Sequence, residues 1–293
     1  MRKFVVFICA LTASAVLRAQ SVPSLLVPAD AAAVVASTVL FSEGRAFESN
    51  AAAAALSPSK YSAWAGVSSW APATAGTFIA GGGASVRLGG KFALGASFKS
   101  FKDKPYDIVS ASGSVSGSFA PSDQFISIGA SYGLLPGLGA GLVLRMVSSA
   151  IAPSMKGSAF CADLTAYYSK GALSAGAGIY NIGSKIDWGG DSYSLPAVVK
   201  AGAAYSVAGL KAGAEAEYLL DGAFGASFGA EYLIAGIVPV RAGYHYGNKE
   251  KGLASYASLG LGARIAGVSL DLSYLLASQT LGGSILVALS YSF

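Results

Sequence analysis

The chain has 293 residues, of which 53% are hydrophobic and only 12% are charged, and its mean hydropathy is +0.55. In ordinary soluble proteins about 25% of residues are charged, so this composition excludes that class. After the first twenty residues no run of 18 apolar residues occurs, which excludes a transmembrane helix. A chain that is apolar overall but never continuously apolar is typical of strands that alternate between lipid and a polar interior.

The first 19 residues have the pattern of a secretory signal peptide. Arg2 and Lys3 form the positive start, residues 4–17 the apolar core, and Ala19 is the small residue before cleavage. Loss of the three cations in this segment lowers the formal net charge from +5 to +2, so no nucleic-acid partner is indicated. We predict an integral protein of the outer membrane of a Gram-negative bacterium.

Residues 20–60 differ from the rest of the chain. They contain alanine-rich runs at 29–36 and 51–55, which favour short helices over strands. We expect this segment to lie in or under the mouth of a barrel as a plug. The alternative is a periplasmic extension that plugs nothing.

Residues 61–293 are predicted to form a succession of strands, because apolar and small or polar residues alternate along them between turn-forming residues. The stretch 107–117 is rich in Ser and Gly and has no aromatic residue, so we assign it to an external loop or a strand extension above the membrane. The fold class is therefore predicted as all-β, a transmembrane antiparallel β-barrel of about 14 strands with a short, partly helical N-terminal segment. An even number suits a bacterial barrel, and the strands are 61–70, 77–88, 91–101, 118–133, 138–149, 158–169, 172–182, 195–206, 210–219, 225–235, 237–247, 255–265, 268–277 and 284–293.

The lengths of the connections support this division. Every second connection is tight, at 89–90, 134–137, 170–171, 207–209, 236 and 266–267. The connections between them are mostly longer, at 102–117, 150–157, 183–194, 247–254 and 278–283. Outer-membrane barrels have short periplasmic turns and longer external loops, so both termini should lie on the periplasmic side.

The charged residues of these strands fall on the face opposite the large apolar residues. A charge on the lipid face at mid-bilayer costs roughly 2–4 kcal/mol, so the avoidance indicates lipid on the apolar face and a lumen on the other. Lys99 shares this placement. The predicted lumen-facing charged network consists of Arg87, Arg145, Asp163, Lys200, Lys211, Glu215, Glu217, Glu231, Arg241, His245, Arg264 and Asp271.

The last strand has the same two faces. Ile285, Val287, Leu289, Tyr291 and Phe293 share one face, and small or polar residues occupy the other apart from one leucine. An amphipathic strand of a soluble sandwich is the alternative for this segment alone. Barrel-assembly machinery reads a terminal aromatic residue on such a strand, so Tyr291 and Phe293 are the expected assembly signal.

Residues for catalysis or metal binding are scarce. His245 is the only histidine, and no Ser or Asp partner is signalled beside it, so we expect a polar residue of the lumen and not a catalyst. Glu215 and Glu217 are spaced as an acid–base pair or a cation site, but lumen cations favour an ion network with Lys211, Arg241 and Arg264. Cys161 is the only cysteine of the mature chain, so it forms no internal disulfide. We expect no enzyme activity, metal or cofactor.

Several motifs in the second half of the barrel resemble the PorV/PorQ family. They are Asn181-Ile182-Gly183, Leu195-Pro196 followed by Lys200-Ala201-Gly202-Ala203-Ala204-Tyr205, Gly229-Ala230-Glu231-Tyr232, Val240-Arg241-Ala242-Gly243-Tyr244, and Tyr274 with the terminal Phe293. The chain departs from the family at Asn50-Ala51-Ala52, where the family usually has Asn-Pro-Ala. The resemblance implies a fourteen-stranded barrel of Bacteroidetes-like bacteria, similar to long-chain fatty-acid transporters, with partners in the type IX secretion system.

Two functions therefore remain open for this barrel. The resemblance implies a non-enzymatic component of type IX secretion or surface attachment. The alternative is an outer-membrane channel for hydrophobic small molecules, which should have an apolar pocket inside its wall. The inward-facing residues are predicted to be mostly Gly, Ser and charged residues, which favours the secretion role. Outer-membrane lipid and the barrel-assembly machinery are expected partners for either function.

Overall fold

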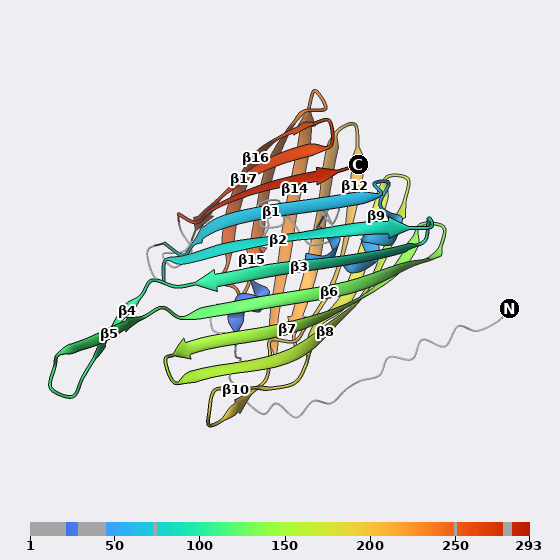
Figure 1. Cartoon of the computed structure of the whole chain (residues 1–293). Helices are drawn as coiled ribbons and strands as arrows, with labels where there is room; N and C mark the ends of the chain where they lie inside the picture. The colour runs from blue at the N-terminus through green and yellow to red at the C-terminus, as the bar shows by residue number, and fades with distance from the viewer. Residues whose placement is uncertain (1–21, 29–44, 73–74, 249–250, 278–282) are drawn as a thin grey trace.

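A computed structural model describes residues 22–28, 45–72, 75–248, 251–277 and 283–293. Fourteen antiparallel strands close into one barrel, each paired with its neighbours and the last paired with the first (Figure 1). This confirms the predicted fold class. The barrel strands are β1 (Tyr61–Trp70), β2 (Thr77–Leu88), β3 (Phe92–Lys102), β6 (Ser122–Leu135), β7 (Leu138–Ala152), β8 (Met155–Lys170), β9 (Leu173–Gly183), β12 (Val198–Val207), β13 (Leu210–Leu219), β14 (Ala223–Ile234), β15 (Val238–Tyr246), β16 (Tyr256–Ile265), β17 (Val268–Ala277) and β18 (Ile285–Ser292).

Two short hairpins lie outside the barrel sheet, in the longer connections. β4 (Tyr106–Val109) pairs only with β5 (Val115–Phe119), and Figure 1 shows this ribbon projecting beyond the barrel rim. The stretch 107–117 is thus correctly kept out of the wall. The predicted strand 118–133 is wrong at its start, because Phe119 belongs to the hairpin and the wall strand begins at Ser122. β10 (Ile186–Asp187) and β11 (Ser192–Tyr193) form the second hairpin.

The barrel closes through its last residue. The amides of Lys60 and Tyr61 donate to the carbonyl of Phe293 at 2.8 and 2.9 Å, and the Phe293 amide donates back to the carbonyl of Tyr61 at 3.0 Å. The rings of Tyr61 and Phe293 lie 5.0 Å apart. A terminal residue with this many contacts is part of the closing seam.

The six connections predicted to be tight lie at the end of the barrel that holds this seam. At the other end β7 and β8 are joined by only two residues, 153–154, so the longer connection predicted at 150–157 is wrong. Ala266 and Gly267, which connect β16 to β17, both have positive φ, at 50° and 82°. Two-residue hairpins need this conformation because it matches the twist of the flanking strands. An Ala-Gly pair with positive φ also occurs at 208–209 and 235–236, so three of the tight connections have the same sequence and the same backbone conformation.

The wall has two faces with opposite chemistry. In β1 exposed and buried side chains alternate without a break. In the last strand Ile285, Leu289 and Phe293 are exposed, whereas Leu286 and Ala288 on the other face are each 1% exposed. Most large side chains on the outer surface are apolar or aromatic, as a surface in contact with lipid requires. In the described ranges no helix is long and apolar enough to cross a membrane.

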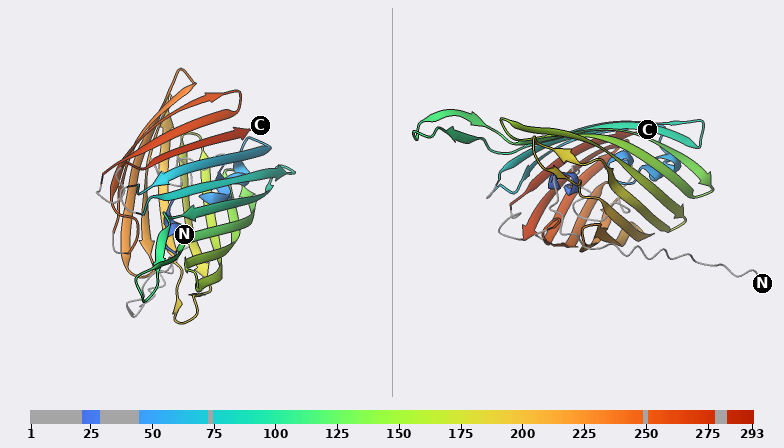
Figure 2. Two further views of the ribbon diagram at one scale, coloured as in Figure 1. Left: turned by 60° about the vertical axis from the view of Figure 1, so that its left-hand side comes forward. Right: turned by 90° about the horizontal axis from the view of Figure 1, so that it is seen from below.

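Short 3₁₀ helices of the N-terminal segment lie inside the barrel (Figures 1 and 2). They are η1 (Pro23–Leu26), η2 (Ala46–Glu48) and η3 (Ala51–Leu56), and η3 packs against the inner faces of β6, β7 and β8. The alanine run allows a close approach: a Cβ added at Gly141 would meet the Ala52 amide nitrogen at 2.5 Å. Asn50 caps η3 by accepting from the Ala52 amide at 3.2 Å and donates to the Ala166 carbonyl at 3.0 Å. The predicted signal peptide and the run 29–36 lie outside the described residues.

Candidate functional site

One end of the lumen, the apolar end, holds an apolar cluster, and the opposite end, the charged end, holds the largest ion network. A further charged group around His245 borders the apolar cluster through Tyr256. The apolar cluster gathers where the longer connections lie, because its wall residues sit at the ends of strands that meet those connections. It contains Trp70, Ile79, Phe101, Phe125, Val147, Leu275 and Leu286, and Ile186 and Leu195 of the connections add to it. The expectation of few large apolar residues in the lumen is therefore wrong.

The N-terminal segment occupies this apolar zone. Val22, Leu25 and Val27 are buried in the same cluster. The Ser24 hydroxyl donates to the carboxylate of Asp123 on β6, which fixes η1 against the wall. A short apolar piece of this chain thus fills space that another apolar group could occupy.

At the opposite end, five charged side chains form a continuous ion network. Asp271 accepts from Arg45 at 2.9 Å through one oxygen and from Arg241 at 2.7 Å through the other. Glu231 accepts from Arg241 and from Arg264, both at 2.7 Å, through the same oxygen. The Arg241 side chain is fully buried, and register pairing of Glu231 with Arg241 across β14 and β15 holds the two together.

A second group of charges surrounds Arg145 in the middle of β7. Its guanidinium contacts Asp163 at 2.8 Å and the Asn181 side-chain oxygen at 2.7 Å. The backbone amide of Asn181 donates to the Asp163 carboxylate at 2.8 Å. This is possible because Asn181 has a φ of 58° and lies beside a register shift between β8 and β9. Glu48 pairs with Lys99 at 3.1 Å nearby. The Glu48 pair attaches the N-terminal segment to β3, and the contacts of Arg145 and Asp163 hold Asn181 at the register shift between β8 and β9.

The third group contains the only histidine. Ser227 and the Nδ1 atom of His245 are 3.0 Å apart, and the Nε2 atom lies 3.9 Å from Glu217. Glu217 itself pairs with Lys200 at 2.9 Å, and the His245 ring stacks on Tyr256 at 5.1 Å. A Ser, a His and a carboxylate therefore meet across three strands, which no local sequence pattern shows. The 3.9 Å separation is too long for the hydrogen bond that orients a catalytic imidazole.

The pairing within the network differs from the expected one. Glu217 binds Lys200, its direct register partner across β12 and β13, and Arg241 and Arg264 bind Glu231. Of the remaining predicted residues, Arg87 donates to the Pro58 carbonyl at 3.2 Å, Lys211 lies in register with Glu231, and Glu215 is buried. In the ranges described, no three His, Cys, Asp or Glu side chains are grouped to hold a metal ion.

Two charged partners in the N-terminal segment were not predicted from the sequence. Arg45 completes the Asp271 pair, and Glu48 completes the Lys99 pair and accepts from the Ser97 hydroxyl. The available signal was that residues 43–48 concentrate charges between two alanine-rich runs. A segment that enters a charged lumen needs charges of its own, because a buried charge must be paired.

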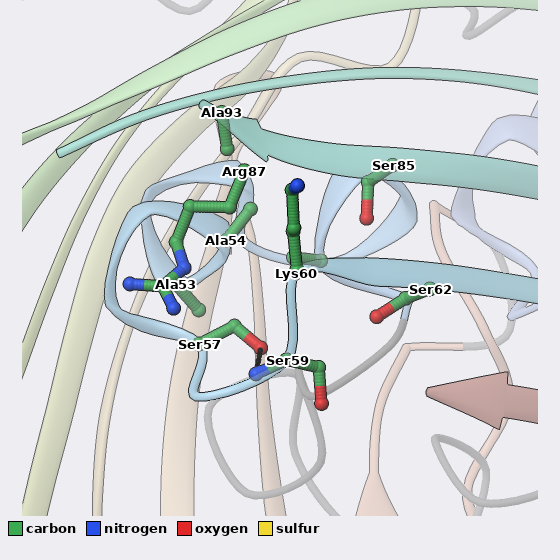
Figure 3. Close-up of a pocket in the computed structure, with 10 residues that line it drawn as sticks. Ala53, Ala54, Ser57, Ser59, Lys60, Ser62, Ser85, Arg87 and Ala93 are labelled. Atoms are coloured by element: carbon green, nitrogen blue, oxygen red, sulfur yellow. Dashed lines mark hydrogen bonds between the residues drawn. The ribbon is translucent and has the colours of Figure 1, made fainter. Parts of the chain in front are cut away.

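Two cavities adjoin at Ser59 at the charged end of the lumen. The smaller has a volume of about 10 Å³, enough for roughly one water molecule. Figure 3 shows it where η3 leads into β1, with Lys60 and Arg87 beside it. The larger has a volume of about 590 Å³ and is lined by Arg45, Lys211, Glu231, Arg241, Arg264 and Asp271, with serines between them.

No family model matches the chain, and no curated protein matches it in sequence. Solved structures do match in fold. The toluene transporter TodX of Pseudomonas putida is 13% identical, with a TM-score of 0.64, over 88% of this chain and 97% of that one. The barrel therefore shares its fold with this transporter.

Two further solved structures match over nearly the whole chain. A FadL homologue of Pseudomonas aeruginosa is 14% identical, with a TM-score of 0.60, over 91% of this chain and 96% of that one. The monoaromatic hydrocarbon channel CymD is 13% identical, with a TM-score of 0.60, over 92% and 98%. Identities this low show the fold alone. The shared architecture is the closed antiparallel β-barrel.

Proposed function

We propose that this protein is an outer-membrane channel for hydrophobic small molecules. The observation that carries the proposal is the apolar cluster inside the lumen, on the side of the longer connections. A polar lumen would suffice for a passive pore, whereas a transporter of apolar compounds needs an apolar site that removes them from water. The barrel fold, shared with structures described as a toluene transporter and a monoaromatic hydrocarbon channel, supports the same function.

The entry side follows from the direction of the chain. Most short turns, and both ends of the chain segment that forms the barrel, lie at the charged end. Because short turns are periplasmic in outer-membrane barrels, this supports a periplasmic position for the charged end and an external position for the apolar zone. An apolar compound arriving from outside meets the apolar zone first. It must compete there with Val22, Leu25 and Val27, which are buried in it.

The secretion role implied by the PorV/PorQ resemblance remains a prediction. The named structural neighbours are transport channels, and the apolar lumen removes the argument that favoured secretion over transport. Recovery of type IX components with the tagged protein from native membranes would restore that role. A barrel recovered alone with bound apolar compounds would support the channel.

A direct test measures uptake of radiolabelled toluene by cells that express the protein. We expect faster uptake than in cells without it, and about tenfold less enhancement for Leu275→Gln, because a buried amide without a partner costs about 1–3 kcal/mol. Leu275 is fully buried in the apolar cluster. Leu275→Met keeps the volume and the apolar surface, so it is the matched control.

Heat-modifiable gel mobility establishes that each variant is a folded barrel. If folded wild-type protein gives no uptake above the background, the channel proposal is wrong. Equal uptake by the Gln and Met variants would show that the apolar cluster is not on the route.

A further inference from the structure

The cavity of about 590 Å³ at the charged end has features that passage of apolar compounds does not explain. It lies between Arg45 of the N-terminal segment and the inner faces of the strands that close the barrel, and the turn at Ala266 and Gly267 forms part of its rim. Ile265 and Val268 are its only large apolar residues among the described lining. Its volume is within the range of sites for small molecules, roughly 300–1,000 Å³.

The lining carries an excess of positive charge. Among the lining residues that the structure describes, four cations and two carboxylates give a formal charge of +2; the six are Arg45, Lys211, Arg241, Arg264, Glu231 and Asp271. Each carboxylate is already shared by two guanidinium groups. The carboxylates therefore fix the guanidinium groups in place without cancelling their charge.

The donors suit a phosphate group. Guanidinium groups present planar pairs of N–H donors that match phosphate oxygens. Arg264 gives one terminal nitrogen to Glu231, and its side chain is still 34% exposed. Hydroxyl groups complete the lining, from Ser59, Ser206, Ser269, Ser290 and Ser292.

We propose that this cavity binds a phosphomonoester group. A phosphomonoester carries a charge of about −1.5 to −2 at neutral pH, which balances the +2 of the lining. The volume exceeds the need of a bare phosphate ion, so a small polar body attached to the phosphate fits the hydroxyl-rich wall. The site lies at the opposite end of the lumen from the apolar cluster, so the proposal that it binds a phosphomonoester does not depend on the proposal of apolar transport.

Calorimetry on the full chain in detergent, in a buffer without phosphate, tests the site. We expect saturable binding of glycerol phosphate and no binding of glycerol. Arg264→Gln and Lys211→Gln should each weaken binding at least about tenfold, as the loss of a hydrogen bond to a charged group does. The matched control is Arg87→Gln, which removes a cation at the same end that lines only the small cavity, and its affinity should stay within twofold.

The same chemistry could come from a lipid, so a second arm uses vesicles that contain phosphatidic acid, a phosphomonoester lipid. Retention of phosphatidic acid that is lost in Arg264→Gln, with no binding of glycerol phosphate, would support the site and identify the lipid as its source. Absence of binding to both compounds overturns the proposal. An equal loss of affinity in Arg87→Gln also overturns it, because the effect would then reflect total charge. If Arg264→Gln does not fold, Lys211→Gln decides.

Discussion

The pair between Arg45 and Asp271 should be the main attachment of the N-terminal segment to the barrel wall. The two side chains are 6% and 2% exposed and 2.9 Å apart. Removing one partner of a buried pair costs about 3–5 kcal/mol, because the remaining charge loses an interaction that offsets its burial, whereas an exposed pair contributes about 0.2–1 kcal/mol. Asp271→Asn should therefore lower the free energy of unfolding by about 3 kcal/mol or more.

A double-mutant cycle isolates the pair from the other contacts of Asp271. Arg241 keeps Glu231 in Asp271→Asn, so the coupling of Arg45→Gln with Asp271→Asn measures mainly the attachment of the segment. We expect a coupling free energy of about 1–3 kcal/mol from urea unfolding of the refolded barrel, followed by tryptophan fluorescence. Asp107→Asn, on the exposed hairpin strand β4, is the control and should stay within about 0.5 kcal/mol. A coupling below about 0.5 kcal/mol would refute the reasoning.

Three further outcomes are expected. Deletion of Phe293 removes the hydrogen bonds of the closing seam and the proposed assembly signal, so membrane levels should fall while export continues; unchanged levels on an immunoblot of outer membranes would contradict this. Gly129→Val should push out Phe47, because an added Cβ would lie 2.6 Å from its ring, and protease should then cleave the N-terminal segment faster. Gly117→Val is the control, because an added Cβ there would meet only Ile108, at an ordinary contact distance of 3.8 Å. Deletion of 21–59 should leave a heat-modifiable barrel that takes up toluene faster if the segment plugs the lumen, and at the same rate if it does not.

The barrel could be predicted because each of its determinants is local in sequence. Side chains two apart share a face of a strand, so the exposed Ile285, Leu289 and Phe293 could be separated from the buried Leu286 and Ala288 without any tertiary information. The tight Ala-Gly turns can likewise be predicted from the two residues that form them.

The height of a residue along the barrel axis could not be obtained in the same way. Alternation tells which face Phe101, Phe125 and Leu275 occupy, but their meeting in one cluster depends on the register of strands far apart in the chain. The same limit explains why Glu217 was assigned to the wrong cations, since a shift of register changes every cross-strand partner. The contacts of Arg45 and Glu48 also join positions distant in sequence, because they connect the segment before β1 to strands β17 and β3.

The two ends of the lumen make different demands on the N-terminal segment, and its sequence meets both. At the apolar end it contributes Val22, Leu25 and Val27, whose burial is favourable but non-directional and so can be replaced by any apolar compound of similar size. At the charged end it contributes Arg45 through an ion pair, which needs one geometry and one partner. An occupant held loosely at the outer end and firmly at the inner end can yield to an apolar ligand without leaving the barrel. Exchange at the outer end should therefore leave the Arg45 contact, and with it the phosphomonoester cavity, unchanged.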